Sequence, residues 1–312
     1  DGVEIAGIYG RSEDRVVPLA AELGVPWTTD LNQLIDDPTI DAIDNCLPAA
    51  QHREPLERAL AKGKHVLVEK PIALTLTEAE DMVSLAEGTD RVVMIAHVLR
   101  FWPEYVALRE HALSGEMGQP KHALAWRRQP FPAWSGLFAH SDLTGGGVLD
   151  QMIHDFDVLN WILGTPQSVV ATGLRNPKSG GWDQVQVLLD YGHASALVDG
   201  GAMMPDSATF ESAMHLLCES GSLQYHFQPS GRGVESGGGR NELRIFPSEG
   251  ESRVLTVDQS DPYLNEVRYW IDCIRSGQPA TVASPAAATL ALRTALATRK
   301  SIETGELTAI PV

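Results

Sequence analysis

The sequence has few cysteines and few positive charges. Its three cysteines, Cys46, Cys218 and Cys273, are odd in number and too scattered for a disulfide framework, so we expect a reducing, cytoplasmic compartment. Lysine and arginine total 24 against 41 aspartates and glutamates, and the net charge of −17 disfavours nucleic acid and anionic membrane surfaces as partners. No apolar run approaches the ~20 residues of a membrane-spanning helix.

The rest of the composition is that of an ordinary globular protein, with 43% hydrophobic residues and 312 positions, enough for two domains. In the first third, short apolar strands alternate with helices. We predict strands at 3–8, 41–48, 64–71 and 91–97, and helices at 14–23, 54–63 and 77–88. Continuous Val/Ile/Leu strands separated by helices indicate a parallel sheet that helices cover on both faces.

The pattern changes near residue 121, where apolar and polar residues begin to alternate as in antiparallel strands. One helix is predicted at 147–163, and two more at 263–276 and 285–304. We therefore predict a doubly wound Rossmann-type α/β domain over residues 1–98, followed by an α+β domain with an open, mainly antiparallel sheet over 99–312.

An open sheet needs a cover on its second face. The alternating strands are expected to place Leu188, Leu197, Met203 and Met214 on that face. A partner sheet packed against it would bury these residues, so we expect a homodimer or a homotetramer formed through this sheet.

The end of the first strand bears on the ligand, because ligands of doubly wound sheets bind beyond the carboxyl ends of the strands. An acidic residue usually ends this strand and bonds the adenosine ribose of a dinucleotide. Here Gly10, Arg11 and Ser12 stand instead, and Arg11 and Ser12 suit a 2′-phosphate. This turn favours NADP over NAD, with a merely solvated turn as the alternative. No G-x-G-x-x-G precedes a helix, so we expect a first strand and glycine loop ahead of Asp1.

Two further strand ends carry candidate cofactor ligands. The second strand ends in Cys46, Leu47 and Pro48, with His52 at the start of the next helix. A strand–proline turn with a helix cap is the structural alternative. The third strand ends in Glu69 and Lys70, where a nicotinamide ring is expected, and a surface salt bridge is the alternative there.

The stretch "TGGGVLDQMIHDFDVLNWILG", residues 144–164, carries a second cluster. On one helix, Asp150, His154 and Asp157 share a face because they stand at i, i+4 and i+7. A carboxylate one turn before a histidine orients the imidazole and stabilises its cation, which makes a general base. The alternatives are a core histidine, or Asp150 and His154 as metal ligands. A metal needs a third ligand, and none is evident, so we expect no metal.

Together these motifs resemble the Gfo/Idh/MocA family, the group of glucose-fructose oxidoreductase and inositol 2-dehydrogenase. The resemblance covers essentially the whole chain, through "DAIDNCLPAAQH", "KHVLVEKPIALT", "HVLRFWPEY", "GGGVLDQMIHDFD" and "LNEVRYWIDCIRSGQP". It implies an NAD- or NADP-dependent oxidoreductase of sugars, cyclitols or related polyols, with Lys70, Asp150 and His154 as catalytic residues.

The resemblance also places five residues near the substrate. His97 and Arg100 stand in the position of the family's "N/H-x-x-R-F" segment, and Arg127, Trp134 and Tyr263 are expected to line the same pocket. The alternatives are a packed strand-end histidine for His97, a buried structural ion pair for Arg100, and loop packing for Trp134.

Two other activities occur on this fold. One is an NAD-dependent glycosidase that hydrolyses through a transient oxidation and recycles its cofactor. The other is a non-catalytic sensor that binds a dinucleotide and a protein partner, which has no need of the three catalytic residues retained here.

Overall fold

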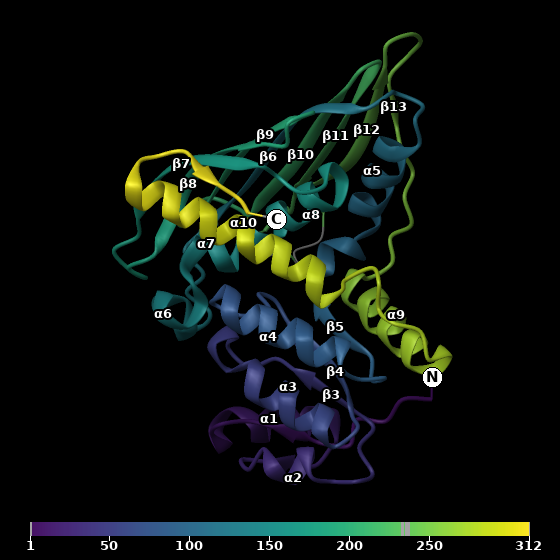
Figure 1. Cartoon of the computed structure of the whole chain (residues 1–312), viewed down its shortest axis with the longest axis vertical. Helices are drawn as coiled ribbons and strands as arrows, with labels where there is room; N and C mark the ends of the chain where they lie inside the picture. Colours follow the sequence, from purple (N-terminus) through teal and green to yellow (C-terminus); the bar gives the residue numbers. More distant parts are fainter. Residues whose placement is uncertain (1, 232–233, 235–237, 312) are drawn as a thin grey trace.

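A small parallel sheet and a large, mainly antiparallel sheet lie at opposite ends of the molecule, with long helices between them (Figure 1). The computed structural model describes residues 2–231, 234 and 238–311. No helix in these residues is long and apolar enough to cross a membrane.

The first domain has the expected alternation of strands and helices. Its elements are β1 (Ile8–Tyr9), α1 (Glu13–Leu23), β2 (Trp27–Thr28), α2 (Asn32–Ile35), β3 (Ala42–Asn45), η1 (Ala49–Gln51), α3 (Arg53–Ala61), β4 (His65–Glu69), α4 (Leu76–Glu87), β5 (Val93–Ala96) and η2 (Val98–Arg100). Strands β3, β4 and β5 form one parallel sheet and β1 and β2 another. The carboxyl ends of β3 and β4 therefore lie at one edge, where a ligand is expected.

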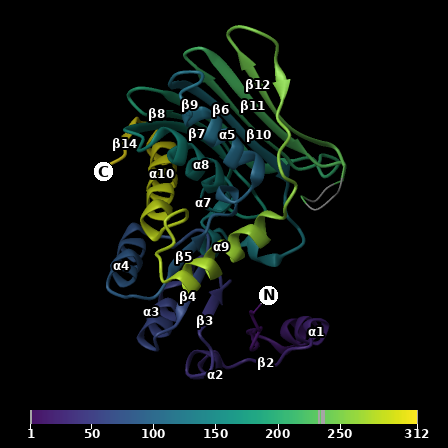
Figure 2. The same cartoon turned by 90° about the vertical axis from the view of Figure 1, so that its right-hand side faces the viewer.

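The first strand is much shorter than predicted. The expected strand over residues 3–8 is reduced to β1, and Val3 and Ile5 are 60% and 52% exposed. Within the described residues β1 pairs only with β2, and no strand pairs with the free edge of β3 (Figure 2). Without neighbours on both sides, an apolar stretch gains too few ladder hydrogen bonds to form a longer strand. The glycine loop expected ahead of Asp1 stays a prediction.

The second domain is built on nine strands. Its elements are α5 (Pro103–Leu113), β6 (Pro120–Pro130), η3 (Gly136–Ala139), α6 (Ser141–Thr144), α7 (Gly146–Asp150), α8 (Ile153–Leu163), β7 (Ser168–Arg175), β8 (Trp182–Asp190), β9 (Ser195–Met204), β10 (Glu211–Cys218), β11 (Gly221–Gln228), β12 (Arg240–Pro247), β13 (Arg253–Val254), α9 (Pro262–Ser276), α10 (Pro285–Thr304) and β14 (Thr308–Ala309). The strand order is β13-β12-β11-β10-β6-β9-β8-β7-β14, antiparallel except for the pair β6–β9.

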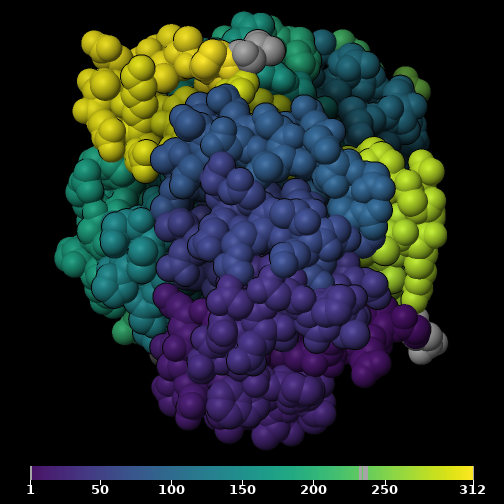
Figure 3. Space-filling view, turned by 60° about the horizontal axis from the view of Figure 1, so that its bottom comes forward, coloured from purple at the N-terminus to yellow at the C-terminus, as the bar shows by residue number. Residues whose placement is uncertain are grey.

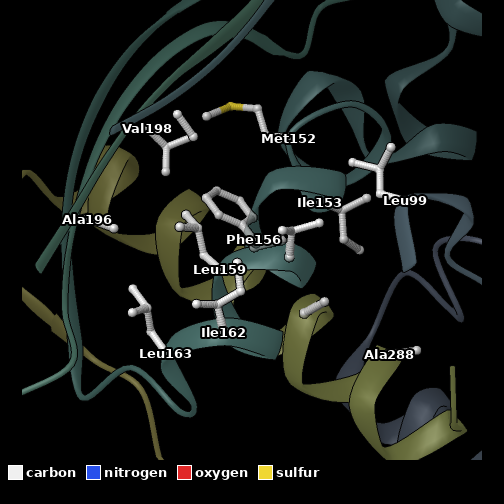
Figure 4. Close-up of a cluster of buried hydrophobic side chains, with 14 of the residues drawn as sticks. Leu99, Met152, Ile153, Phe156, Leu159, Ile162, Leu163, Ala196, Val198 and Ala288 are labelled. Atoms are coloured by element: carbon white, nitrogen blue, oxygen red, sulfur yellow. The ribbon is translucent and has the colours of Figure 1, made fainter. Parts of the chain in front are cut away.

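Helices cover one face of this sheet. Helix α8 packs its Phe156 and Leu159 toward Ala196 and Val198 of β9 (Figure 4). Helix α10 packs along α8 and β7 and also reaches α4 of the first domain. Burying each large side chain of this layer stabilises the fold by about 1.5–3 kcal/mol.

The last two helices return to the first domain. Trp270 and Cys273 of α9 share an apolar cluster with Leu67 of β4 and Met94 of β5. Figure 3 shows α9 and α10 flanking the residues of the first domain on two sides. Both helices of the second domain therefore lie against the first domain.

The other face of the large sheet carries exposed apolar residues, but fewer than predicted. Leu188, Leu197 and Met203 are exposed as expected. The prediction for Met214 is wrong, because this residue is fully buried and belongs to the core on the helical side.

Candidate active site

A pocket opens where the carboxyl end of β4 meets α7, α8 and the large sheet. Its cavity volume is about 170 Å³. The structure brings Lys70, Asp150 and His154 together in its lining, although the first lies 80 residues before the second. Trp134 and Tyr263, both predicted to line the pocket, do so as well.

Lys70 reaches the pocket because it follows the last residue of β4. Its Nζ donates hydrogen bonds to the Asp150 carbonyl oxygen at 2.7 Å and to Asp150 Oδ1 at 3.0 Å. Both side chains keep some contact with solvent, at 17% and 27% exposure. The ammonium is thus held in place by two oxygens and still faces the pocket.

Asp150 does not hold His154, contrary to the prediction. The expected helix over residues 147–163 is broken into α7 and α8, with Gln151 and Met152 between them. The break removes the i, i+4 geometry that would bring a carboxylate to the imidazole. The carboxylate of Asp150 binds Lys70 instead, and an ammonium in that place disfavours a metal cation.

Glycines set the position of α7. Gly145 and Gly146 have φ angles of 82° and 72°, in the left-handed region that glycine adopts without strain. The Gly147 amide then donates to Asp183 Oδ1 at 2.7 Å. This turn fixes the start of the short helix that ends at Asp150.

His154 stands in the first turn of α8. Burial lowers the pKa of its imidazole well below the usual value, and the nearby positive charges of Lys70 and Arg127 lower it further. The ring is therefore neutral at pH 7. Its Nδ1 is buried without a hydrogen-bond partner among the described residues.

Asp157, His97 and Arg100 form a buried group behind the pocket. Arg100 donates through Nε and Nη2 to the two carboxylate oxygens of Asp157, each at 2.8 Å, and through Nη1 to the Val282 carbonyl. Burial lowers the pKa of His97 to about 4. None of the three lines the pocket. The geometry favours the structural alternatives for His97 and Arg100, and their contact with a substrate stays a prediction.

Arg127 lines the pocket but is already paired. Its Nε and Nη2 donate to Asp155 at 2.9 and 3.0 Å, and Nη2 also donates to the Tyr105 hydroxyl at 3.3 Å. Asp155 is fully buried at the start of α8. The ion pair therefore anchors α8 to β6, and it leaves Arg127 less available to a substrate than the sequence suggested.

His52 has a structural role. It is 1% exposed, Nε2 lies 2.6 Å from the Leu47 carbonyl, and Nδ1 lies 3.1 Å from the Pro71 carbonyl. With both nitrogens occupied, the ring ties the turn after β3 to the turn after β4. These contacts favour the structural role, and direct contact of His52 with a cofactor stays a prediction.

The other predicted cofactor residues lie at strand ends. Cys46, Leu47 and Pro48 form the turn after β3, and the Cys46 thiol donates to Asp44 Oδ1 at 3.3 Å. Gly10, Arg11 and Ser12 follow β1, where Ser12 is the N-cap residue of α1 and its side chain makes no capping bond. A Cβ on Gly10 would stand 2.6 Å from Val16, so glycine allows α1 to pack close to this strand end.

Sequence reasoning missed Glu266 on α9. It is 3% exposed, and its Oε1 has no hydrogen-bond partner in the described part of the chain. Burial, together with the negative charges of Glu69 and Asp44, raises the pKa of Glu266 to about 8. The sequence signal that could have revealed it is its spacing: Glu266 shares the buried face of α9 with Trp270 at i+4 and Cys273 at i+7.

Comparison with known proteins identifies the family. Residues 1–97 match the Gfo/Idh/MocA oxidoreductase family with its NAD-binding Rossmann fold, and residues 105–224 match a Gfo/Idh/MocA C-terminal domain. The chain is 25% identical to scyllo-inositol 2-dehydrogenase (NAD(+)) of Bacillus subtilis over 97% of this chain and 88% of the relative. It is 27% identical to myo-inositol 2-dehydrogenase of Thermotoga maritima over 97% and 90%.

A solved structure shares the whole fold. An oxidoreductase from Agrobacterium radiobacter, in complex with NAD+, L-tartaric acid and magnesium, superposes with a TM-score of 0.84 at 23% identity, covering 99% of this chain and 92% of that one. Both domains match in sequence family, and the two-domain architecture matches in three dimensions. The chain therefore belongs to the Gfo/Idh/MocA family and is an oxidoreductase built on an NAD-binding Rossmann fold.

Proposed function

We propose that the protein transfers a hydride between a nicotinamide cofactor and a hydroxyl-bearing or carbonyl carbon of a sugar, cyclitol or related polyol. The observation that supports this most is the convergence of Lys70, Asp150 and His154 on one pocket at the carboxyl edge of the parallel strands. The inositol dehydrogenases among the relatives support the same class of substrate.

The residues at this edge fit a nicotinamide cofactor. Glu266 presents a buried carboxyl oxygen without a partner next to Glu69 and Asp44, the kind of acceptor that a carboxamide N–H or a cationic ring would satisfy. Lys70, Glu69 and the turn Cys46–Pro48 would hold this end of the cofactor. When bound, the cofactor accepts or supplies the hydride.

The chain's own residues handle the oxygen and the proton. The Lys70 ammonium donates a hydrogen bond to the reacting oxygen and favours the negative charge that develops there. The neutral His154 imidazole accepts the hydroxyl proton as the hydride leaves the carbon, so that a carbonyl forms. Asp150 positions Lys70 through the two bonds described above. The reverse reaction returns the proton from His154 to the oxygen.

A preference for NADP over NAD belongs to the same proposal. Arg11 is exposed, no residue in the described ranges forms an ion pair with it, and the Ser12 hydroxyl makes no capping bond. Both groups are thus available to a 2′-phosphate. The strand end itself carries no carboxylate, and the nearest ones in sequence, Glu13 and Asp14, belong to the first turn of α1.

The test is a spectrophotometric screen of cyclitols and aldoses with NAD+ and with NADP+, following absorbance of the reduced cofactor. We expect reduction with at least one polyol or sugar, and faster reduction of NADP+. The absence of reduction with every substrate and both cofactors would contradict the proposed reaction. A clear preference for NAD+ would contradict the NADP preference that residues 10–12 predict.

We also propose a homodimer that pairs two copies through the open face of the large sheet. Val170 of β7, Leu188 of β8 and Leu197 of β9 are cross-strand neighbours and are all more than 40% exposed. A continuous apolar row of this kind is costly in water and suits a self-complementary interface.

The three free thiols support a cytoplasmic location.

A further inference from the structure

The pocket has one wall made of aromatic rings. Trp102 precedes α5, Phe210 precedes β10, and Phe227 lies on β11; all three line the pocket. Phe227 joins them into one surface, with ring centroids 5.5 Å from Trp102 and 6.1 Å from Phe210. These separations are typical of edge-to-face and tilted aromatic packing, so the wall is a continuous apolar surface.

The hydroxyl groups of Tyr225 and Tyr105 and the Arg127 guanidinium, which lie near this wall, are already bonded. The Tyr225 hydroxyl donates to Asn241 Oδ1 at 3.1 Å, and the Tyr105 hydroxyl accepts from Arg127. The Arg127 guanidinium is paired with Asp155 and lies 5.7 Å from the Phe210 ring centroid. Ser212 and Gln129 also line the pocket, so the hydrogen-bonding groups left on this side for the hydroxyls of a substrate are few.

The polar groups that the proposed reaction uses are gathered on a different wall, at the end of β4 and along residues 150–154. This wall holds the Lys70 ammonium, the Asp150 carboxylate and the His154 imidazole. Between them, Gln151 donates through Nε2 to the Arg127 and Gly201 carbonyls, while its Oε1 is buried without a partner in the described residues. That oxygen therefore keeps its capacity to accept a hydrogen bond.

Apolar surface continues to the rim of the pocket. Trp134 is 82% exposed, and its ring packs edge-on against Phe138 with centroids 4.8 Å apart. Both side chains line the pocket. An indole that is exposed to water beside a pocket has apolar area to gain from a ligand that covers it.

From these two walls we infer that the substrate is a sugar or polyol ring that carries an aromatic substituent, as in an aryl glycoside. The hydroxyls face Lys70, Gln151 and His154, and the substituent packs among Trp102, Phe210 and Phe227 with Trp134 at the rim. A free hexose or cyclitol can set only the C–H face of its ring against this wall, so an aromatic substituent covers more of the apolar surface and leaves the hydroxyls to the polar wall. The placement of the reacting hydroxyl at Lys70 and His154 rests on the proposed function, whereas the placement of the aromatic substituent rests on the aromatic wall alone.

The test compares matched glycosides in two independent measurements. Phenyl and methyl β-D-glucopyranosides, the corresponding galactoside pair, and myo-inositol are titrated calorimetrically for binding and are then assayed for cofactor reduction. We expect the phenyl member of at least one pair to bind roughly tenfold or more tightly than its methyl counterpart and than myo-inositol. Equal affinity of phenyl and methyl members in both pairs, or tighter binding of myo-inositol, overturns the inference.

Variants assign the preference to the aromatic wall. Phe227→Ala should reduce the phenyl-to-methyl affinity ratio to about one, while Phe246→Ala, on β12 and outside the pocket, should keep it. An unchanged ratio in a folded Phe227→Ala protein contradicts the assignment. Tight phenyl glycoside binding without any cofactor reduction would overturn the proposed reaction and leave the binding inference standing, so the two failures are distinguishable.

Discussion

Lys70 and Asp150 act as one unit at the scale of single residues. Both are partly buried, so the attraction at 3.0 Å is stronger than for a surface pair, and the carbonyl of Asp150 adds a second acceptor. His154 contributes the opposite property, a ring kept neutral by burial beside positive charge. One fixed cation and one neutral base within the same pocket are what the transfer of a hydroxyl proton requires.

Glu266 makes stability depend on pH. The native carboxyl keeps its proton up to about pH 8, whereas the unfolded one loses it near 4.5. The unfolded state therefore binds fewer protons between these values, and stability falls as pH rises from 4.5 to 8. Glu266→Gln removes this loss. In urea unfolding, we expect the free energy of unfolding of the variant, relative to wild type, to be about 1–3 kcal/mol higher at pH 9 than at pH 5.

The comparison needs an exposed glutamate as its control. Glu22→Gln on α1 should change stability equally at both pH values, because Glu22 is exposed. A stability difference between Glu266→Gln and wild type that stays constant from pH 5 to pH 9 would show that the buried carboxyl is already ionised.

The sequence predicts those residues whose position follows from a strand end or a motif. Glu69 ends a strong apolar strand and Lys70 follows it, and Asp150 and His154 follow a glycine turn. Ion pairs between residues that are far apart in the chain cannot be predicted from local sequence patterns. Arg100 and Asp157 stand 57 residues apart, and Arg127 and Asp155 28 apart, so nothing local shows that each guanidinium already has its carboxylate. The same holds for Glu266, whose acidic neighbours come from β3 and β4.

At the scale of elements, the break between α7 and α8 decides which partner Asp150 has. Periodicity predicts one helix over 147–163, because apolar spacing continues through the break. The spacing of apolar residues gives no information on how closely α7 packs against β8. A Cβ on Gly147 would stand 2.8 Å from Asp183 Oδ1 and 3.1 Å from the Trp182 carbonyl, so only glycine allows this close packing. Tertiary packing therefore overrides the helical pattern here.

Gly147→Ala tests this anchor. The added methyl has to displace α7 from β8, which should destabilise the fold by about 1–3 kcal/mol and move Asp150 away from Lys70. In steady-state kinetics and urea unfolding we expect a lower kcat together with lower stability. Gly136→Ala is the matched control, since nothing lies within 4 Å of the position of its Cβ. Wild-type kcat and stability in Gly147→Ala would refute the role given to this packing.

At the scale of the whole molecule, the open face of the large sheet remains to be covered. Strand alternation predicts this face from the sequence, since the period of two assigns Leu188 and Leu197 to the side away from the helices. Met214 was misassigned because the strand that contains it, β10, could not be placed in register from its own residues.

Leu188→Arg should dissociate the proposed dimer. A charge in the middle of the apolar row would be buried without a partner in the dimer and solvated in the monomer. Light scattering at micromolar concentration should give twice the chain mass for wild type and the chain mass for the variant. Leu19→Arg, on the exposed side of α1, should remain dimeric. A monomeric wild-type protein would contradict the proposed interface.

The turnover of Lys70→Ala shows whether Lys70 holds the reacting oxygen during hydride transfer. With the best substrate from the screen, and with folding verified by circular dichroism, we expect kcat to fall roughly 10²–10⁴-fold. Lys121→Ala, an exposed lysine on β6, should keep wild-type kcat. A folded Lys70→Ala enzyme that turns over at the wild-type rate would contradict the account.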